Sequence, residues 1–223
     1  MKKFIVLTIL TLQVTLMFAQ NGQQRISISH YVFPEFIEGK VLKKQGGSNN
    51  VLLNYNTLTR EMIFDQNGYR FALAELNNID TVYLINRKFV PVDSGFYEVI
   101  PTRSNISLYI NHISKVSVPG VSDGYGSTSN ASSAVALSSL VNTAGGSNPG
   151  GRAIYNLKLP DEYKVIPKVE FYLKTENGFI KINGLKQVMK ALPDRAQGIK
   201  KYADDTHSKL NNQKSLVDLF NSI

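Results

Sequence analysis

Cysteine and tryptophan are both absent from the 223 residues of this chain. The lack of cysteine excludes disulfides, a thiol nucleophile and the lipid-modified cysteine of bacterial lipoproteins. An exported chain without disulfides depends on its hydrophobic core, which suits a bacterial periplasm or outer surface better than animal secretion. The eleven Tyr and eleven Phe residues lie mostly in strand-like patterns, which indicates core packing.

Familiar catalytic and cofactor motifs are also missing. The chain has no Gly-x-Ser-x-Gly elbow, and in GGSNPGGRA the Lys and the Ser or Thr of a phosphate-binding loop are replaced by Arg152 and Ala153. His30, His112 and His207 lie far apart and have no second ligand at metal-binding spacing. The sequence therefore predicts no cofactor and no metal site.

Clustered charge is scarce. The formal net charge is +8, but beyond the N-terminal leader only Lys43-Lys44, Arg87-Lys88 and Lys200-Lys201 place two basic residues side by side. Nucleic-acid binders concentrate Lys and Arg on one face beside base-stacking aromatics. We therefore predict no nucleic-acid partner.

A long apolar run occurs only at the N-terminus. Lys2 and Lys3 precede an uncharged, mostly apolar run at 4–18, which ends in Ala19. This is the pattern of a secretory signal peptide, and the run is shorter than the roughly 20 residues that span a bilayer as a helix. We expect residues 1–19 to be a signal peptide, cleaved before Gln20, with no transmembrane segment left after its removal.

Residues 37–118 consist of short β-branched and aromatic runs separated by turn residues, which indicates β structure. Asn67-Gly68 and Asn177-Gly178 each offer the two positive-φ residues of a type I′ hairpin turn. The aromatic cluster at 31–36 is interpreted as the apolar start of this domain, with an exposed docking strip as the alternative. Further strands are predicted at 80–85, 88–92, 96–100, 105–110, 110–118, 153–159 and 169–174, with Pro91 suited to an edge or a bulge.

The period of the apolar residues changes near the C-terminus. Leu185, Val188, Met189 and Leu192 follow the spacing of an amphipathic helix, with Asn183 as N-cap and Pro193 as the stop. Two more helices are predicted from Ala196, Ile199 and Ala203, and from Leu216, Leu219, Phe220 and Ile223 behind Asn212.

Three helices of this length are marginal alone in water, so we expect residues 183–223 to dock on a β domain of residues 20–182. The predicted fold class is α+β: a mainly antiparallel β domain, sandwich or barrel-like, with a C-terminal group of three short helices.

Residues 124–151, GYGSTSNASSAVALSSLVNTAGGSNPGG, form a long run without charge. Strands are predicted on both sides of it, so we interpret residues 121–151 as a flexible loop within one β domain, with an interdomain linker as the alternative. Tyr125, Leu137 and Leu140 are the predicted interaction residues of this loop.

Three long stretches carry a resemblance: YVFPEFIEGKVLKKQGGSNNVLLNYNTLTREMIF, IDTVYLINRKFVPV and the C-terminal ALPDRAQGIKKYADDTHSKLNNQKSLVDLFNSI. Together they resemble a group of exported proteins from Bacteroidetes-type bacteria, over nearly all of the mature chain. The resemblance implies an exported protein folded as a single unit and carries over no catalytic residue. Asp80-Thr81-Val82 also resembles the O-glycosylation signal of such bacteria.

Three functions stay open at this point. We favour a non-enzymatic cell-envelope protein, in the periplasm or associated with the outer membrane, that binds a protein partner. The alternatives are a module that binds a glycan or another small ligand, and a hydrolase with a fold-assembled carboxylate site. The candidate acids, chosen by residue type alone, are Glu35, Glu38, Asp161 and Glu162.

Overall fold

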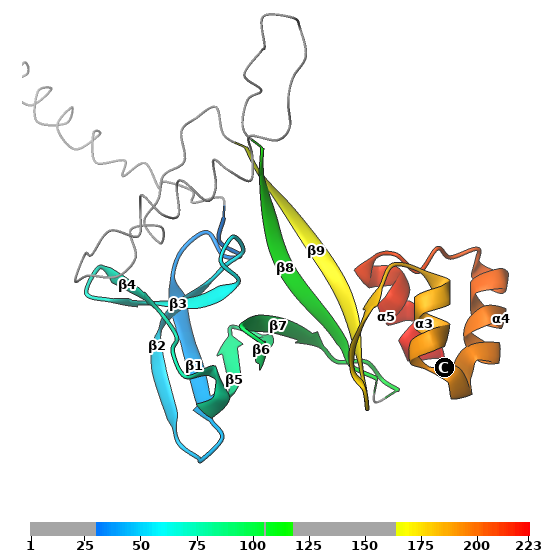
Figure 1. The fold of residues 1–223 in the computed structure, drawn as a ribbon, viewed down its shortest axis with the longest axis horizontal. Coiled ribbons are helices and arrows are strands. Elements are labelled where there is room, and N and C mark those ends of the chain that lie inside the picture. Colours follow the sequence, from blue (N-terminus) through cyan, green and yellow to red (C-terminus); the bar gives the residue numbers. More distant parts are fainter. Residues whose placement is uncertain (1–29, 105, 118–163) are drawn as a thin grey trace, which may run out of the picture.

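A computed structural model describes residues 30–104, 106–117 and 164–223. The strands are β1 (Ile37–Lys43), β2 (Ser48–Asn56), β3 (Glu61–Gln66), β4 (Tyr69–Ala72), β5 (Ile79–Leu84), β6 (Arg87–Val92), β7 (Gly95–Ile100), β8 (Leu108–Ser117), β9 (Lys164–Thr175) and β10 (Gly178–Ile182). The helices are α3 (Leu185–Ala191), α4 (Ala196–Thr206) and α5 (Gln213–Ser222), with short 3₁₀ turns η2 (Leu76–Asn78) and η4 (Pro193–Arg195) (Figure 1). The α+β fold, an antiparallel sheet followed by three helices, is confirmed.

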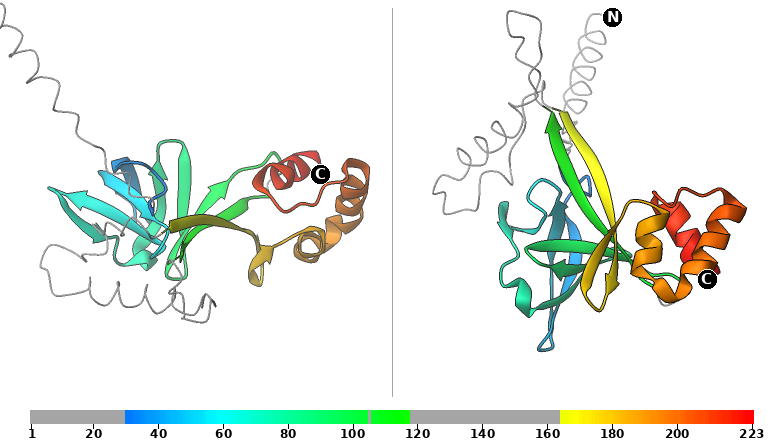
Figure 2. Two further views of the ribbon diagram at one scale, coloured as in Figure 1. Left: turned by 90° about the horizontal axis from the view of Figure 1, so that it is seen from above. Right: turned by 45° about the vertical axis from the view of Figure 1, so that its right-hand side comes forward.

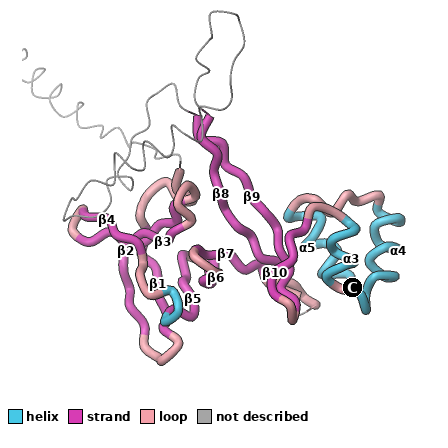
Figure 3. The backbone as a smooth tube through the Cα atoms, in the orientation of Figure 1, coloured by secondary structure: helices cyan, strands magenta, loops and turns pink. Residues whose placement is uncertain are grey.

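All ten strands belong to one sheet, in the order β10-β9-β8-β7-β6-β5-β1-β2-β3-β4 (Figure 3). The strands β1 to β4 form a meander, after which the chain returns so that β5 pairs with the free side of β1. A second meander then runs from β5 to β10. The strand β1 therefore joins two antiparallel meanders into one sheet.

The two predicted hairpin turns have different outcomes. Asn67 and Gly68 have φ values of 55° and 86° and connect Gln66 to its partner Tyr69, which confirms the first turn. The second prediction was wrong by one residue, because Thr175 pairs with Gly178 and only Gly178 has a positive φ. Residues 176–177 form the turn and Gly178 follows with a positive φ, a geometry that is common in short hairpins besides the type I′ turn.

The half of the sheet formed by β1 to β7 curls so that β2 and β3 face β7. The Tyr55 hydroxyl donates to the Phe96 carbonyl oxygen at 3.2 Å, and a Cβ added to Gly95 would lie 2.9 Å from the Arg60 carbonyl oxygen. The curl encloses a cluster that we call the strand cluster: Phe33, Val41, Leu53, Tyr55, Met62, Ile79, Val82, Leu84, Phe89 and Phe96. Phe33 lies in this cluster, as expected of an apolar start to the domain.

The helices cover only one end of the other half of the sheet, where they gather beside β9 and β10 (Figure 2). Strand and helix residues share one cluster there, which we call the helix cluster: Leu108, Ile110, Phe171, Leu173, Ile182, Val188, Ala191, Ile199, Ala203, Leu210, Leu216, Leu219 and Phe220. The amphipathic stripes predicted from the sequence supply its helical side.

Helix ends follow the prediction in part. Asn212 caps α5, since its Oδ1 accepts a hydrogen bond from the Ser215 amide at 2.9 Å. The predicted cap at Asn183 was wrong: the N-cap of α3 is Gly184, with φ 156° and no side-chain cap. Pro193 begins η4, directly after α3 and Leu192, as a helix stop should.

The strand β8 is longer than its contact with β7. Only Leu108–Ile110 pair with β7, whereas β8 and β9 stay paired from Leu108 with Leu173 to Ser117 with Lys164. Beyond the strands that flank them, residues 111–117 and 164–170 continue as a two-stranded arm that we call the β8–β9 arm (Figure 1). Its base is tied to the turn after β2, since the Ser114 amide donates to the Thr57 carbonyl oxygen at 3.0 Å. Pro91 was predicted at an edge or a bulge, but its strand β6 lies between β5 and β7. Pro91 pairs only with Phe96 of β7 and lies beyond residues 87–89, where β6 pairs with β5.

Several predictions fall outside the described residues and stay predictions: the signal peptide at 1–19, the loop at 121–151 with Tyr125, Leu137 and Leu140, the strand at 153–159, and the acids Asp161 and Glu162. Among the helices that the structure does describe, none is both long enough and apolar enough to cross a membrane.

Candidate functional site

One row of side chains crosses seven strands on the inner face of the sheet and passes from the strand cluster to the helix cluster. Successive pairs in the ladder join Val41, Val82, Phe89, Glu98, Ile110, Phe171 and Ile182. Glu98 is the charged member of this row, and only 5% of its surface is exposed. A buried carboxylate requires partners, so the surroundings of Glu98 identify the candidate site.

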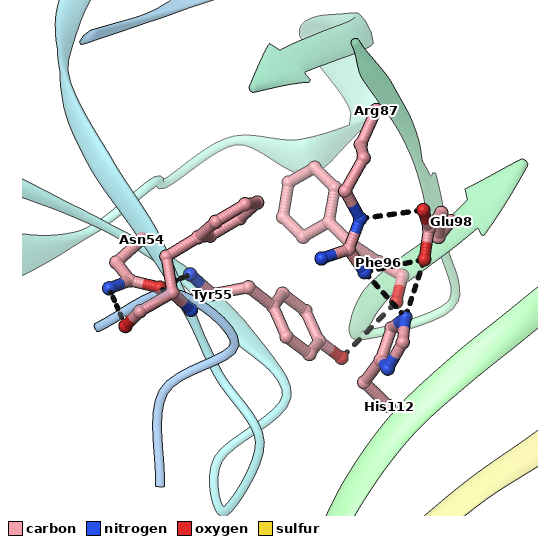
Figure 4. A network of polar contacts seen from close by, with 7 residues as sticks. Asn54, Tyr55, Arg87, Phe96, Glu98 and His112 are labelled. Atoms are coloured by element: carbon pink, nitrogen blue, oxygen red, sulfur yellow. Dashed lines mark hydrogen bonds and ion pairs between the residues drawn. The ribbon is translucent and has the colours of Figure 1, made fainter. Parts of the chain in front are cut away.

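Glu98 is held by two basic side chains (Figure 4). Arg87 donates from Nε to Oε1 and from Nη2 to Oε2, both at 2.6 Å. His112 Nε2 lies 2.6 Å from the same Oε2. Because an ionised carboxylate only accepts hydrogen bonds, His112 Nε2 carries a hydrogen. His112 Nε2 and Arg87 Nη2 lie 3.0 Å apart because both donate to the same oxygen, Glu98 Oε2. We call these three residues the ionic cluster.

The charge state of Glu98 follows from these contacts. Burial alone would raise the pKa of its carboxyl group, but the hydrogen bonds and positive charges of His112 and Arg87 outweigh burial and lower that pKa to about 2. Glu98 is therefore ionised at neutral pH. With so low a pKa it is a poor general acid or base for a reaction near pH 7.

Strand geometry explains how the ionic cluster assembles. Arg87 lies two residues before Phe89 on β6, and His112 two residues after Ile110 on β8, so both side chains share the face of Glu98. The Arg87 guanidinium also lies over two aromatic rings, 5.0 Å from the centroid of Phe33 and 5.3 Å from that of Phe89. Stacking and bidentate pairing together fix its position.

Asn54 positions the segment that carries Phe33. Its Oδ1 accepts from the Phe33 amide at 3.1 Å, and its Nδ2 donates to the carbonyl oxygens of Phe33 and Glu35 at 2.8 and 2.9 Å. Asn54 is only 1% exposed. The asparagine thus ties this irregular segment to β2 and sets Phe33 against Arg87.

A cavity of about 300 Å³ lies beside the ionic cluster. It forms where the segment before β1, the turn after β2, the strand β6 and the base of the β8–β9 arm meet. Its lining residues are Tyr31, Val32, Thr57, Arg87, His112, Ile113, Ser114, Pro167, Lys168 and Val169.

The acids chosen from the sequence do not form this site. Glu35 and Glu38 are exposed, lie before and within β1, and are not among the residues that line the cavity. Thr81 is only 3% exposed, and its hydroxyl donates to Asp80 at 2.9 Å, so the folded chain does not present it to a modifying enzyme.

The three histidines occupy three different environments. His112 belongs to the ionic cluster, and His207 is exposed at the end of α4. His30 is 1% exposed, and burial together with the positive charge of Arg70 lowers its pKa to about 4. Within residues 30–104, 106–117 and 164–223, no three His, Asp or Glu side chains lie close enough to hold a metal ion.

Sequence reasoning missed the ionic cluster because it searched for ligand spacing and paired acids along the chain. Glu98, Arg87 and His112 come from three strands and meet only through the sheet register. The available signal was a charge in an apolar strand: FYEVI contains one acid among four apolar residues. Such a residue requires buried partners if the strand is central.

Comparisons with protein-family models, with curated proteins and with solved structures gave no match. The site is therefore interpreted from its own geometry.

Proposed function

We propose that this protein is an exported component of the bacterial cell envelope that works by binding a protein partner, without catalysing a reaction. The signal-peptide pattern at 1–19 and the resemblance to exported Bacteroidetes-type proteins support the compartment. The ionic cluster favours a binding function over a catalytic one, because each oxygen of the Glu98 carboxylate is already held by a basic side chain.

The observation that carries partner binding is the β8–β9 arm. Its apolar side chains Ile166 and Val169 are 52% and 44% exposed, and Pro167 between them is exposed as well. The arm leads directly to residues 118–163, which contain the predicted contact residues Tyr125, Leu137 and Leu140. Exposed apolar groups on a projecting element are typical of interaction surfaces.

A photo-crosslinking amino acid at Ile166, introduced in the native host, tests the proposal. Leu52 on β2 is the matched control, because it is also a strand residue and is 47% exposed. We expect one discrete crosslinked species from position 166 and none from position 52. Equal crosslinking from both positions, or none from 166, would contradict partner binding through the arm.

Export is tested separately by intact mass. Protein recovered from the envelope fraction is expected to begin at or near Gln20, and a chain that retains Met1 would contradict the signal peptide.

A further inference from the structure

The cavity beside the ionic cluster combines basic and apolar groups. Arg87 brings positive charge, His112 brings an imidazole, and Val32, Pro167 and Val169 bring apolar surface. Lys168 also borders the cavity, but its ammonium is paired with Glu170 at 3.4 Å. No Asp or Glu is among its lining residues in the described part of the chain. An anion with an apolar portion is the ligand class that such a lining recognises.

Arg87 has donors to spare. Its Nε and Nη2 are committed to Glu98, but Nη1 has no acceptor among the described residues. Figure 4 shows this nitrogen on the side of the guanidinium away from Glu98, without a contact. The Arg87 side chain is 30% exposed, so it is open to a ligand. A guanidinium can hold one carboxylate on Nε and Nη2 and still donate two N–H groups from Nη1.

The position of Arg87 is also fixed in advance. Glu98 holds it from one side, and the rings of Phe33 and Phe89 lie 5.0 and 5.3 Å from its central carbon. A ligand therefore meets a guanidinium that has already lost its side-chain freedom. Preorganisation of this kind favours binding because less conformational entropy is lost on association.

The volume limits the ligand. About 300 Å³ is at the lower end of the range for small-molecule sites. An oligosaccharide is too large for it, whereas a small branched or aromatic acid fits.

We propose that this cavity binds a carboxylate that carries a small apolar group, with the carboxylate on Arg87 and the apolar group against Val32, Pro167 and Val169. Two sources share this chemistry: a free small acid, and the carboxyl terminus of a peptide that ends in an apolar residue. The cavity shares Pro167 and Val169 with the exposed surface of the β8–β9 arm, whereas Ile166 does not line it, so the crosslinking test at Ile166 and the binding test below can fail separately.

The test uses the full mature chain and two pairs of probes. The first pair is 4-methylpentanoate and its uncharged amide; the second is the tripeptide acetyl-Ala-Ala-Leu with a free and with an amidated C-terminus. Binding is followed by NMR through the methyl signals of Val32 and Val169, with probe concentrations up to about 10 mM. We expect each acid that binds to shift these signals, with an affinity at least about tenfold above that of its amide.

The pattern across the acids identifies the source. Binding of 4-methylpentanoate alone indicates a free small acid, binding of the tripeptide acid alone indicates a peptide terminus, and binding of both indicates a general carboxylate site. Equal binding of acid and amide, or no shift at Val32 and Val169 with either acid, would overturn the proposal.

Two variants keep the test independent of the ionic cluster. Val169→Trp places a large side chain at the cavity and is expected to weaken acid binding by about tenfold or more, with Val32 as the reporter. Ile166→Trp, three residues away on the same strand, is the matched control, because Ile166 is exposed but does not line the cavity. If the two variants bind the acids equally well, the cavity is not the site.

Discussion

The two halves of the sheet bury their inner faces in different ways. The strands β1 to β7 curl until β2 and β3 face β7, so the strand cluster is closed by the sheet itself and by the segment that carries Phe33. The strands β8 to β10 do not close on themselves, and residues 188–220 supply eight of the thirteen members of the helix cluster. A single sheet thus combines sheet-on-sheet and helix-on-sheet packing, and Glu98 lies in the row that connects them.

The largest expected effects come from removing an aromatic ring from either cluster. Phe220 in the helix cluster and Phe89 in the strand cluster are both fully buried, so Phe220→Ala and Phe89→Ala should each lower the free energy of unfolding by about 3–5 kcal/mol. Because the Glu98 row connects the clusters, we expect one unfolding transition in both variants. Denaturant titration followed by far-UV and near-UV circular dichroism checks this.

The control for these variants is Leu52→Ala, since Leu52 is 47% exposed and should change stability by less than about 0.5 kcal/mol. A second transition in Phe220→Ala that is absent from Phe89→Ala would show that the two halves unfold separately.

The next effect concerns Glu98, in the row of side chains that connects the two clusters. Glu98→Gln leaves Arg87 without its counter-ion and removes the carboxylate acceptor of His112, and should cost about 3 kcal/mol at pH 7, since removing one partner of a buried ion pair leaves the other uncompensated. Glu38→Gln, at an exposed carboxylate, is the matched control.

The pH dependence of that cost is the sharper measurement. The pKa of Glu98 is lowered from 4.5 to about 2, so its stabilising contribution is complete above pH 4.5 and is lost as pH falls from 4.5 to 2. The difference between wild type and Glu98→Gln should shrink across that window. The pKa of His30 is lowered from 6.5 to about 4, so the stability that His30 contributes is lost as pH falls from 6.5 to 4. This second loss should be the same in wild type and in Glu98→Gln, and it therefore cancels in their difference. A pH-independent difference would mean that Glu98 is not ionised in the fold.

A smaller effect tests the curl. Gly95→Ala would place a Cβ 2.9 Å from the Arg60 carbonyl oxygen, so the turn between β2 and β3 must move away from β7, at a cost of about 1–3 kcal/mol. Gly198→Ala is the matched control in the helical half. Nothing lies within 4 Å of a Cβ there, and it should stabilise α4 by about 0.5–1 kcal/mol. Thermal unfolding of both variants should show shifts of opposite sign.

The smallest effect tests the helix ends. Asn212→Ala removes the cap of α5 and should cost about 1 kcal/mol, whereas Asn183→Ala should have no measurable effect, since that side chain caps no helix. Equal losses in the two variants would contradict the assignment of the α3 cap to Gly184.

The periodic features were predictable from the sequence, and the long-range ones were not. The turn at Asn67-Gly68, the three amphipathic stripes and the Asn212 cap depend on residues close together in the chain, so local patterns were sufficient. The return of β5 to β1 and the curl depend on which surfaces fit together. The same holds for the ionic cluster, in which Glu98 and His112 meet through a ladder between β7 and β8. Asn183 was mistaken for a cap because Gly184, with its unusual backbone, stands next to it.

The separation of β8 from β9 in the chain has a consequence for biosynthesis. The ribosome completes β8 before it makes residues 118–163, and β9 follows only after them. Until β9 has emerged, from the ribosome or on the far side of the membrane after export, β8 stays an unpaired edge, with Leu108 and Ile110 uncovered. Exposed edges of this kind recruit other strands. The nascent chain is therefore most prone to misassociation in this interval, and a chaperone that shields β8 would protect it.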